Sequence, residues 1–179
     1  MRYLMALLAP LLILTACAGS SVNAVAVTGF DSEKYLGTWY EVARLDHSFE
    51  RGLSHVSATY TRREDGKITV LNQGYKASSQ KTKTAIGKAK FAADSITGHL
   101  KVSFFGPFYG DYIIFDLDKT AYSRAYVSGG TDNYLWLLSR TSTVTESVRQ
   151  DFITKSEALG YDTGELIWVD QSSPKTQEN

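Results

Sequence analysis

The sequence predicts an all-β protein, in which eight antiparallel strands form an up-and-down barrel and one α-helix follows. Short runs rich in Val, Ile, Thr, Tyr and Phe recur between turn signals such as Asp65-Gly66, Gly98 and Gly129-Gly130. From Thr143 to Leu159, apolar residues recur instead at helical spacing. Closing the strands into a barrel removes exposed edges and leaves an interior just wide enough for side chains or one small molecule.

The N-terminus has the pattern of a targeting segment. Arg2 precedes an apolar run from Leu4 to Leu14, and such a run is typical of a secretory signal but too short for a transmembrane helix. The next residues complete Leu14-Thr15-Ala16-Cys17, which resembles the lipobox of bacterial lipoproteins, where the cysteine receives a diacylglyceryl group. We therefore expect residues 1–16 to be a lipoprotein signal peptide. Cys17, the only cysteine in the chain, is the expected lipid attachment site.

The lipobox resemblance also implies a location. Several acyl chains hold a protein firmly on a membrane, whereas one chain binds only marginally. Ala18 follows the cysteine where an aspartate would imply retention, so the outer membrane, facing the periplasm, is expected. Residues 17–28 are small and polar and are predicted to be a lipidated tether. Residues 29–171 then form one barrel domain, and residues 172–179 a disordered polar tail.

The barrel strands follow one another at regular spacing. The clearest hairpin turns at Asp65-Gly66, because this dipeptide accepts the positive φ angles of a tight turn. After the last strand, Thr143 and Glu146 fit a capping box, and Gly160 can end the helix in a left-handed conformation. A short extended piece over 165–169 follows. The predicted strands are 38–45, 55–63, 67–75, 83–92, 99–105, 111–117, 122–128 and 133–140.

Three separated motifs point to a family. Gly37-Thr38-Trp39-Tyr40 begins the first strand, Thr131-Asp132-Asn133-Tyr134 precedes the eighth, and Arg140 ends it. In this order they resemble the lipocalin family, from about Phe30 to Val169. The resemblance implies that the helix packs outside the barrel, that Trp39 closes its narrow end, and that Arg140 lies over the indole, a favourable cation–π contact. It implies structural roles for Gly37, Trp39, Thr131, Asp132, Tyr134 and Arg140.

A narrower resemblance suggests the ligand. The stretches Tyr35–Arg44 and Ser103–Gly110 are most similar to the bacterial outer-membrane lipocalins and, more distantly, to the apolipoprotein D branch. This implies that fatty acids or lysophospholipids are bound in the barrel and stored or transported at the cell envelope. The preference for lysophospholipid comes from the resemblance alone. Transfer of acyl CH₂ groups out of water, about 0.8 kcal/mol each, would drive binding.

The cavity residues are predicted from strand alternation, which sends every second side chain inward. Trp39 fixes the inward face only for its own strand, and composition and the resemblance select it for the others. Ala85, Gly87 and Ala89 are small, which favours an open cavity, although a solid barrel is the alternative. The candidate ligand-binding residues are Ala58, Tyr60, Val70, Ala89, Phe91, Val102, Phe104, Tyr112, Ile114 and Trp136.

Two loops carry unusual residues. Phe104, Phe105, Phe108 and Tyr109 form the densest aromatic cluster in the chain. Such a loop could guide an acyl chain inward, rest on a membrane interface, or fold over the barrel's open end and bury itself. The other loop contains four charged or titratable residues, which we interpret as a surface charge cluster. These residues are Asp46, His47, Glu50 and Arg51.

Several function classes find little support. The formal net charge is zero and no basic stripe is present, so nucleic acid is not an expected partner. His47, His55 and His99 are not at metal-ligand spacing, and no metal or cofactor is expected. Without a Gly-x-Ser-x-Gly elbow or a phosphate loop, an enzyme is not expected.

Two alternatives to a lipid carrier stay open. One is a weak lipid esterase that uses a histidine. The other is a structural envelope lipoprotein whose solid barrel binds a protein partner. A homodimer is compatible with such a barrel, but nothing in the sequence predicts an interface.

Overall fold

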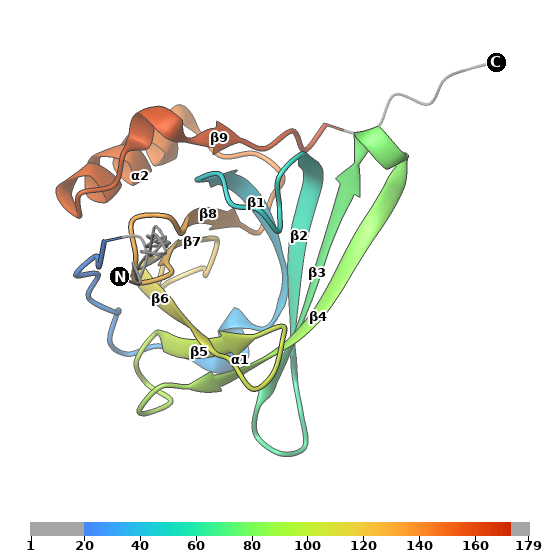
Figure 1. The fold of residues 1–179 in the computed structure, drawn as a ribbon. Coiled ribbons are helices and arrows are strands. Elements are labelled where there is room, and N and C mark those ends of the chain that lie inside the picture. The colour runs from blue at the N-terminus through green and yellow to red at the C-terminus, as the bar shows by residue number, and fades with distance from the viewer. Residues whose placement is uncertain (1–19, 173–179) are drawn as a thin grey trace, which may run out of the picture.

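The computed structural model describes residues 20–172 (Figure 1). The predicted signal peptide, the predicted attachment site Cys17, the next two residues of the predicted tether and residues 173–179 of the predicted tail lie outside the described residues. Within them, no helix has the length and apolar character needed to cross a membrane. The elements are α1 (Ser32–Tyr35), β1 (Gly37–Arg44), β2 (Leu53–Arg62), β3 (Ile68–Lys76), η1 (Ala77–Ser79), β4 (Lys81–Phe91), β5 (His99–Ser103), β6 (Gly110–Leu117), β7 (Arg124–Ser128), β8 (Leu135–Ser139), α2 (Glu146–Ala158), η2 (Thr163–Glu165) and β9 (Ile167–Trp168).

The strands form one antiparallel sheet that closes on itself. Their order is β2-β3-β4-β5-β6-β7-β8-β1-β9, and β1 also pairs with β2 (Figure 1). The predicted eight-stranded barrel with an outer helix is therefore confirmed. The extra strand, β9, pairs with the end of β1 at Ala43 and Arg44. Because successive strands alternate in direction, the β1–β2, β3–β4, β5–β6 and β7–β8 connections all lie at one end, the open end.

The opposite end of the barrel is closed. Trp39 is fully buried there, and the Arg140 guanidinium lies 3.9 Å from the centre of its ring. Gly37 has a φ of 91°, and a Cβ at this position would lie 3.4 Å from Arg140 Nη1. The guanidinium also donates hydrogen bonds of 2.8 Å to backbone carbonyls that join α1 to β1. These carbonyls belong to Lys34, Leu36 and Thr38.

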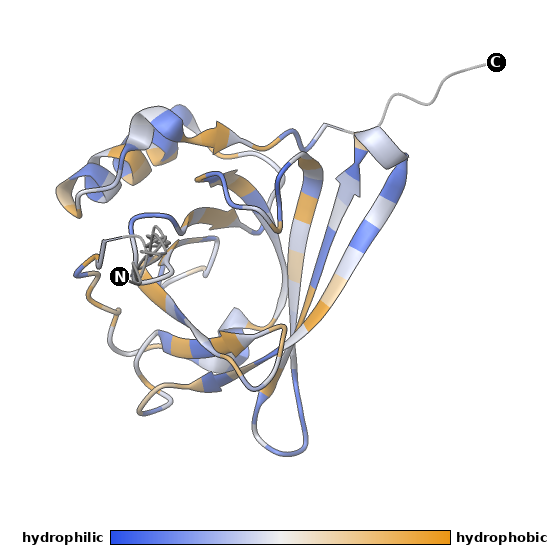
Figure 2. Ribbon diagram, viewed as in Figure 1, coloured by the Kyte–Doolittle hydropathy of each residue, from blue (hydrophilic) through white to orange (hydrophobic). Residues whose placement is uncertain are grey.

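Alternation along the strands produces two cores. Hydrophobic and hydrophilic bands follow one another along β2 and β4 (Figure 2), so that one face of each strand lines the interior. The inner core fills the closed half of the barrel around Trp39 and Ile114. The outer core lies beneath α2, where Phe152 is fully buried with its ring centre 5.0 Å from that of Tyr126.

Helix α2 begins later than the capping box predicts. Thr145, not Thr143, is the N-cap, and its hydroxyl accepts a hydrogen bond of 3.4 Å from the Val148 amide. Both threonines suit this position. The helix that begins after Thr145 packs Val148 and Phe152 against the barrel. At the other end, Gly160 has a φ of 91°, the left-handed conformation expected after a helix.

The described part of the predicted tether is not a free linker. Residues 20–28 lie along the outside of the barrel from its open end to its closed end. Near the open end, the Asp132 amide donates to Ser20 O at 3.0 Å, and further along the Val27 amide donates to Ile114 O at 2.9 Å. Small polar side chains do not prevent this, because an extended backbone pairs through its own donors and acceptors.

Smaller differences occur at element boundaries. The four-residue helix α1, capped by the Asp31 carboxylate, has no counterpart in the prediction, because one helical turn shows no periodicity. Strand β7 begins at Arg124 and not at residue 122, since Tyr122 has a φ of 52° and interrupts the extended conformation.

Candidate ligand cavity

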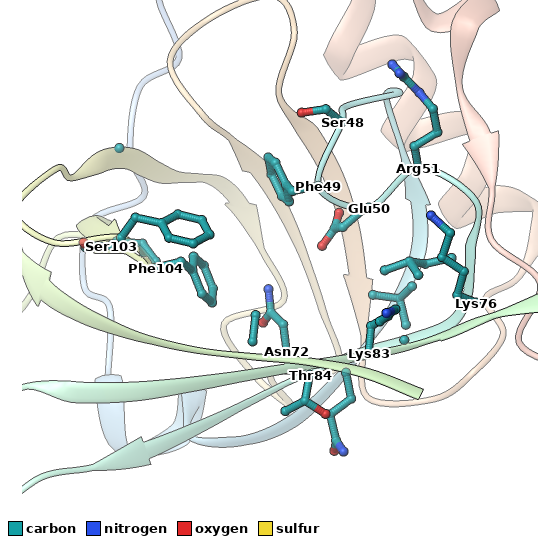
Figure 3. A pocket seen from close by; sticks show the side chains of 18 of the residues that line it. Ser48, Phe49, Glu50, Arg51, Asn72, Lys76, Lys83, Thr84, Ser103 and Phe104 are labelled. Atoms are coloured by element: carbon teal, nitrogen blue, oxygen red, sulfur yellow. The ribbon is translucent and has the colours of Figure 1, made fainter. Parts of the chain in front are cut away.

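The open half of the barrel encloses a cavity with two adjoining chambers. The mouth has a volume of about 600 Å³ and the deeper chamber about 290 Å³, within or close to the range of small-molecule sites. Figure 3 shows Phe49 and Glu50 reaching over the mouth from the β1–β2 loop, with Asn72 of β3 and Phe104 across from them. These four residues and Val102 line both chambers.

The mouth extends to the first half of β4, between this strand and the β5–β6 loop. Strand β4 has 11 residues and β5 only five, and pairing between them is limited to the last four residues of β4. Residues 81–87 therefore lack a strand neighbour on that side within the described chain. The β5–β6 loop, residues 104–109, borders this part of β4. Its four aromatic residues line the mouth together with Lys83, Thr84 and Ala85.

Tyrosines form the floor of the deeper chamber. The Tyr112 hydroxyl shares hydrogen bonds of 2.7 Å with the Tyr35 hydroxyl and 2.8 Å with the Tyr60 hydroxyl. Burial raises the pKa of all three phenols, so they remain neutral. Because their hydroxyls bond one another, the floor offers mainly aromatic surface to a ligand, which suits the end of an apolar chain.

The predicted ligand-binding residues separate into two groups. Ala89, Phe91 and Ile114 face the barrel interior but belong to the packed core of the closed half. The space beside Gly87 is also not open, because a Cβ there would lie 2.8 Å from the Phe104 ring. The expectation that Gly87 enlarges the cavity is therefore wrong. The residues that do line the cavity are Ala58, Tyr60, Val70, Val102, Phe104, Tyr112 and Trp136.

A charged network lies buried in the cavity wall beneath the β1–β2 loop. Arg44 Nη1 donates to Glu41 Oε1 at 2.6 Å, and Nη2 donates to the Glu50 carbonyl at 3.0 Å. Trp136 Nε1 donates to Glu50 Oε2 at 3.2 Å. His47 Nε2 lies 3.1 Å from the same oxygen, but neither ring nitrogen of His47 makes a hydrogen bond within the described protein. The network fixes the loop over the cavity.

Burial determines the charges in this network. It raises the pKa of Glu41 well above its ordinary value, and the negative charge of Glu50 adds to the effect. Burial also raises the pKa of Glu50. Burial and, next, the charge of Arg44 lower the pKa of His47 to about 4. At neutral pH, His47 is therefore uncharged, and one cation faces two carboxyl groups, which favours retention of a proton at Glu41.

The prediction of a surface charge cluster in this loop is wrong for half of its members. Asp46 and Arg51 do form an exposed ion pair of 2.7 Å. His47 and Glu50 are buried, because the loop folds inward against Trp136. Sequence reasoning also missed Glu41 and Asn72, although alternation from Trp39 and Val70 would place both on the inward face.

The rim of the mouth carries cations and exposed aromatic rings. Arg51, Lys76 and Lys83 line it. The aromatic loop does not bury itself, since Phe105 and Phe108 are 81% and 78% exposed. Of the three interpretations of this loop, the two functional ones fit the exposure.

Two histidines have hydrogen-bonding partners within the described residues. His99 Nε2 lies 2.6 Å from Asp111 Oδ1, and His55 contacts Ser54 and Ser172. His55 Nδ1 lies 2.9 Å from Ser54 Oγ, but its Nε2 contacts the Ser172 carbonyl and not a carboxylate, so the pair lacks the third group of a hydrolytic triad. Within residues 20–172, no group of three or more His, Cys, Asp or Glu side chains could hold a metal ion.

Comparison with known proteins gives consistent matches. Residues 30–171 match the family model described as a lipocalin-like domain. The chain is 54% identical to the outer membrane lipoprotein Blc of Vibrio cholerae over 159 residues, which cover 89% of this chain and 93% of that protein. It is 47% identical to the outer membrane lipoprotein Blc of Escherichia coli K12 over 145 residues, 81% of each chain.

More distant matches agree with these. Apolipoprotein D of Rattus norvegicus is 33% identical over 119 residues, 62% of this chain and 61% of that protein. Among solved structures, insecticyanin of the tobacco hornworm Manduca sexta aligns with a TM-score of 0.70 at 19% identity, over 87% of this chain and 88% of its own. At this identity the structural match concerns the fold.

Proposed function

The chain belongs to the lipocalin family, and on this premise we propose that it binds fatty acids or lysophospholipids in its barrel cavity and stores or transports them at the cell envelope. As a lipocalin, it takes a small hydrophobic ligand. The observation that carries the proposal is the two-chambered cavity, which is open at one end and floored by aromatic rings.

The shape and chemistry of the cavity favour a ligand with one apolar chain and an anionic head. Tyr60 and Tyr112 line the deeper chamber, where an acyl chain would leave water. Lys76 and Lys83 at the mouth would attract a carboxylate or phosphate that remains near solvent. Both proposed ligand classes share this polarity.

The protein is an outer-membrane lipoprotein, as its relatives of 47 and 54% identity are named. Cys17 is the proposed acyl attachment site. This location brings the cavity close to membrane lipids, which are the source of both proposed ligands.

Ligand titration with a cavity-filling variant tests the proposal. The background is Cys17→Ser, which removes the acyl attachment and alters none of the described residues. Native mass spectrometry should detect one lipid per chain, and Trp136 fluorescence should change saturably because its indole lines the deeper chamber. Val102→Phe, which fills both chambers, should weaken binding at least tenfold, roughly the effect of losing 1.4 kcal/mol of contact.

The matched control is Ile86→Phe, since Ile86 is exposed on the neighbouring strand β4 and lines neither chamber. Binding should be unchanged in this variant. Absence of any adduct and of any Trp136 response with both lipid classes would refute the carrier proposal. Recovery of a stoichiometric protein partner on an unresponsive barrel would favour the structural lipoprotein. Histidine-dependent turnover of lysophospholipid would favour the esterase.

A further inference from the structure

The N-terminal segment is attached to the open end of the barrel. The Val22 amide donates to Gly130 O and the Asp132 amide donates to Ser20 O, both at 3.0 Å. These partners belong to the β7–β8 turn, beside the mouth. Cys17 precedes Ser20 by only three residues, and three residues span about 11 Å at most. An acyl anchor on Cys17 therefore holds the open end, and not the closed end, near the membrane.

Exposed aromatic rings gather at the same end. Phe49, Phe105 and Phe108 are the only large aromatic side chains among residues 20–172 that are mainly exposed, and all three lie in open-end loops. Exposed phenylalanines that rim a cavity form an interaction surface. Aromatic rings are favoured at the boundary between headgroups and acyl chains.

The charges around the open end suit a phospholipid surface. Lys76, Lys81 and Lys83 lie at the β3–β4 corner, where the end of β4 is hydrophilic (Figure 2), and none of them forms an ion pair within the described residues. Their ammonium groups are therefore available to lipid phosphates.

We propose that the open end of the barrel docks on the leaflet that holds the anchor, with Phe105 and Phe108 in the headgroup region and the mouth facing the bilayer. The inference rests on the proposed lipid anchoring and ligand class. A single-chain lipid could then pass between the bilayer and the mouth without crossing bulk water. The short anchor distance favours the membrane over a second copy or a protein partner as the occupant of this surface.

Depth measurement on the full lipidated chain in phospholipid vesicles tests the orientation. Because the sulfur of Cys17 is used in the lipid bond, Phe108→Cys and Ile96→Cys each supply one thiol for a nitroxide label. Ile96 is the matched control, since it is 64% exposed and lies in the connection between β4 and β5 at the closed end. Membrane-soluble oxygen should relax the label at 108 more than a water-soluble nickel chelate does. The chelate should relax the label at 96 more than oxygen does.

Two outcomes would overturn docking. One is a label at 108 that is as accessible to the chelate as the label at 96. The other is a label at 108 shielded from both reagents, because this would indicate a protein interface. The measurement is made with and without lysophospholipid. Failure of lipid binding alone leaves the label positions unchanged, so the two proposals fail separately.

Transfer kinetics supply a functional readout. In Phe105→Ser/Phe108→Ser, uptake of a fluorescent lysophospholipid from vesicles should slow roughly tenfold more than uptake of the same lipid supplied as monomers, because docking contributes only to the first route. Any direct loss of cavity contacts affects both routes. Ile96→Ser should change neither. Equal slowing of both routes in the double variant would contradict a docking role.

Discussion

Arg140 and Arg149 each place a guanidinium over a tryptophan ring, but only Arg140 also bonds the backbone. Its guanidinium lies 3.9 Å from the Trp39 ring and donates to several carbonyls. Arg140→Lys keeps the charge and loses this planar set of donors. We expect the free energy of unfolding, measured in urea, to fall by about 2 kcal/mol, since carbonyls at the closed end lose their partners.

Arg149→Lys is the control for this prediction. Arg149 lies 4.4 Å from the Trp168 ring on the outer surface, and no hydrogen bond of its guanidinium is found within residues 20–172. The change should cost less than about 0.5 kcal/mol, as exposed charge contacts usually do. Equal losses in the two variants would show that the charge over the ring, and not the bonding to the backbone, supports the closed end.

Individual site residues differ in how far the sequence could predict them. Glu41 follows Trp39 by two positions, so alternation alone places it inside the barrel. His47 and Glu50 lie in a loop without alternation, and their burial depends on Trp136, which the chain brings there from strand β8. A pattern confined to the loop contains no information on that contact, and four charged or titratable residues among six loop positions suggest exposure to solvent.

At the scale of elements, strand β4 packs closely against the start of the β5–β6 loop at Gly87. A Cβ on this residue would lie 2.8 Å from the Phe104 ring and 2.9 Å from the Ser103 carbonyl oxygen. Gly87→Ala should therefore lower the free energy of unfolding by about 1–3 kcal/mol through overpacking. It should also displace Phe104 toward the cavity and weaken lipid binding. Thermal unfolding and ligand titration measure the two effects.

Gly110→Ala is the matched control for stability, because a Cβ there would meet nothing within 4 Å. Its stability should change by less than about 0.5 kcal/mol. If Gly87→Ala has the same free energy of unfolding as the natural protein, then β4 and the β5–β6 loop separate readily. The small residue would then enlarge the cavity, as the sequence suggests.

The elements themselves were predictable where one face is apolar. All eight barrel strands were expected, because alternation and turn residues repeat along the chain. The sequence does not decide between Thr143 and Thr145 as the N-cap of α2, because either threonine can cap a helix and only packing against the barrel selects one. The docking of residues 20–28 was equally hidden, because it uses backbone groups that every sequence has.

At the scale of the whole molecule, the buried network makes stability depend on pH in two opposing ways. Glu41 and Glu50 have raised pKa values in the folded protein. Their stabilising contribution is therefore complete below their unfolded values and is lost as the pH rises. His47 has a pKa lowered from 6.5 to about 4, so its contribution is lost as the pH falls from 6.5 toward 4. Between pH 4 and pH 6.5, the loss of the His47 contribution and the gain from Glu41 and Glu50 as the pH falls partly cancel.

His47→Gln removes one side of this balance. At pH 7 the variant loses the stacking of His47 on Phe49 and its contact with Trp136, and this packing loss should itself be independent of pH. The destabilisation relative to the natural protein should shrink by up to about 3 kcal/mol between pH 7 and pH 4, at about 1.4 kcal/mol per pKa unit. Urea unfolding at several pH values measures this difference. Glu41→Gln, which removes a group with a raised pKa, should change the pH dependence in the opposite direction, gaining relative stability as the pH rises. A pH-independent difference for His47→Gln would mean that the histidine titrates normally, and that the β1–β2 loop opens to water before it unfolds.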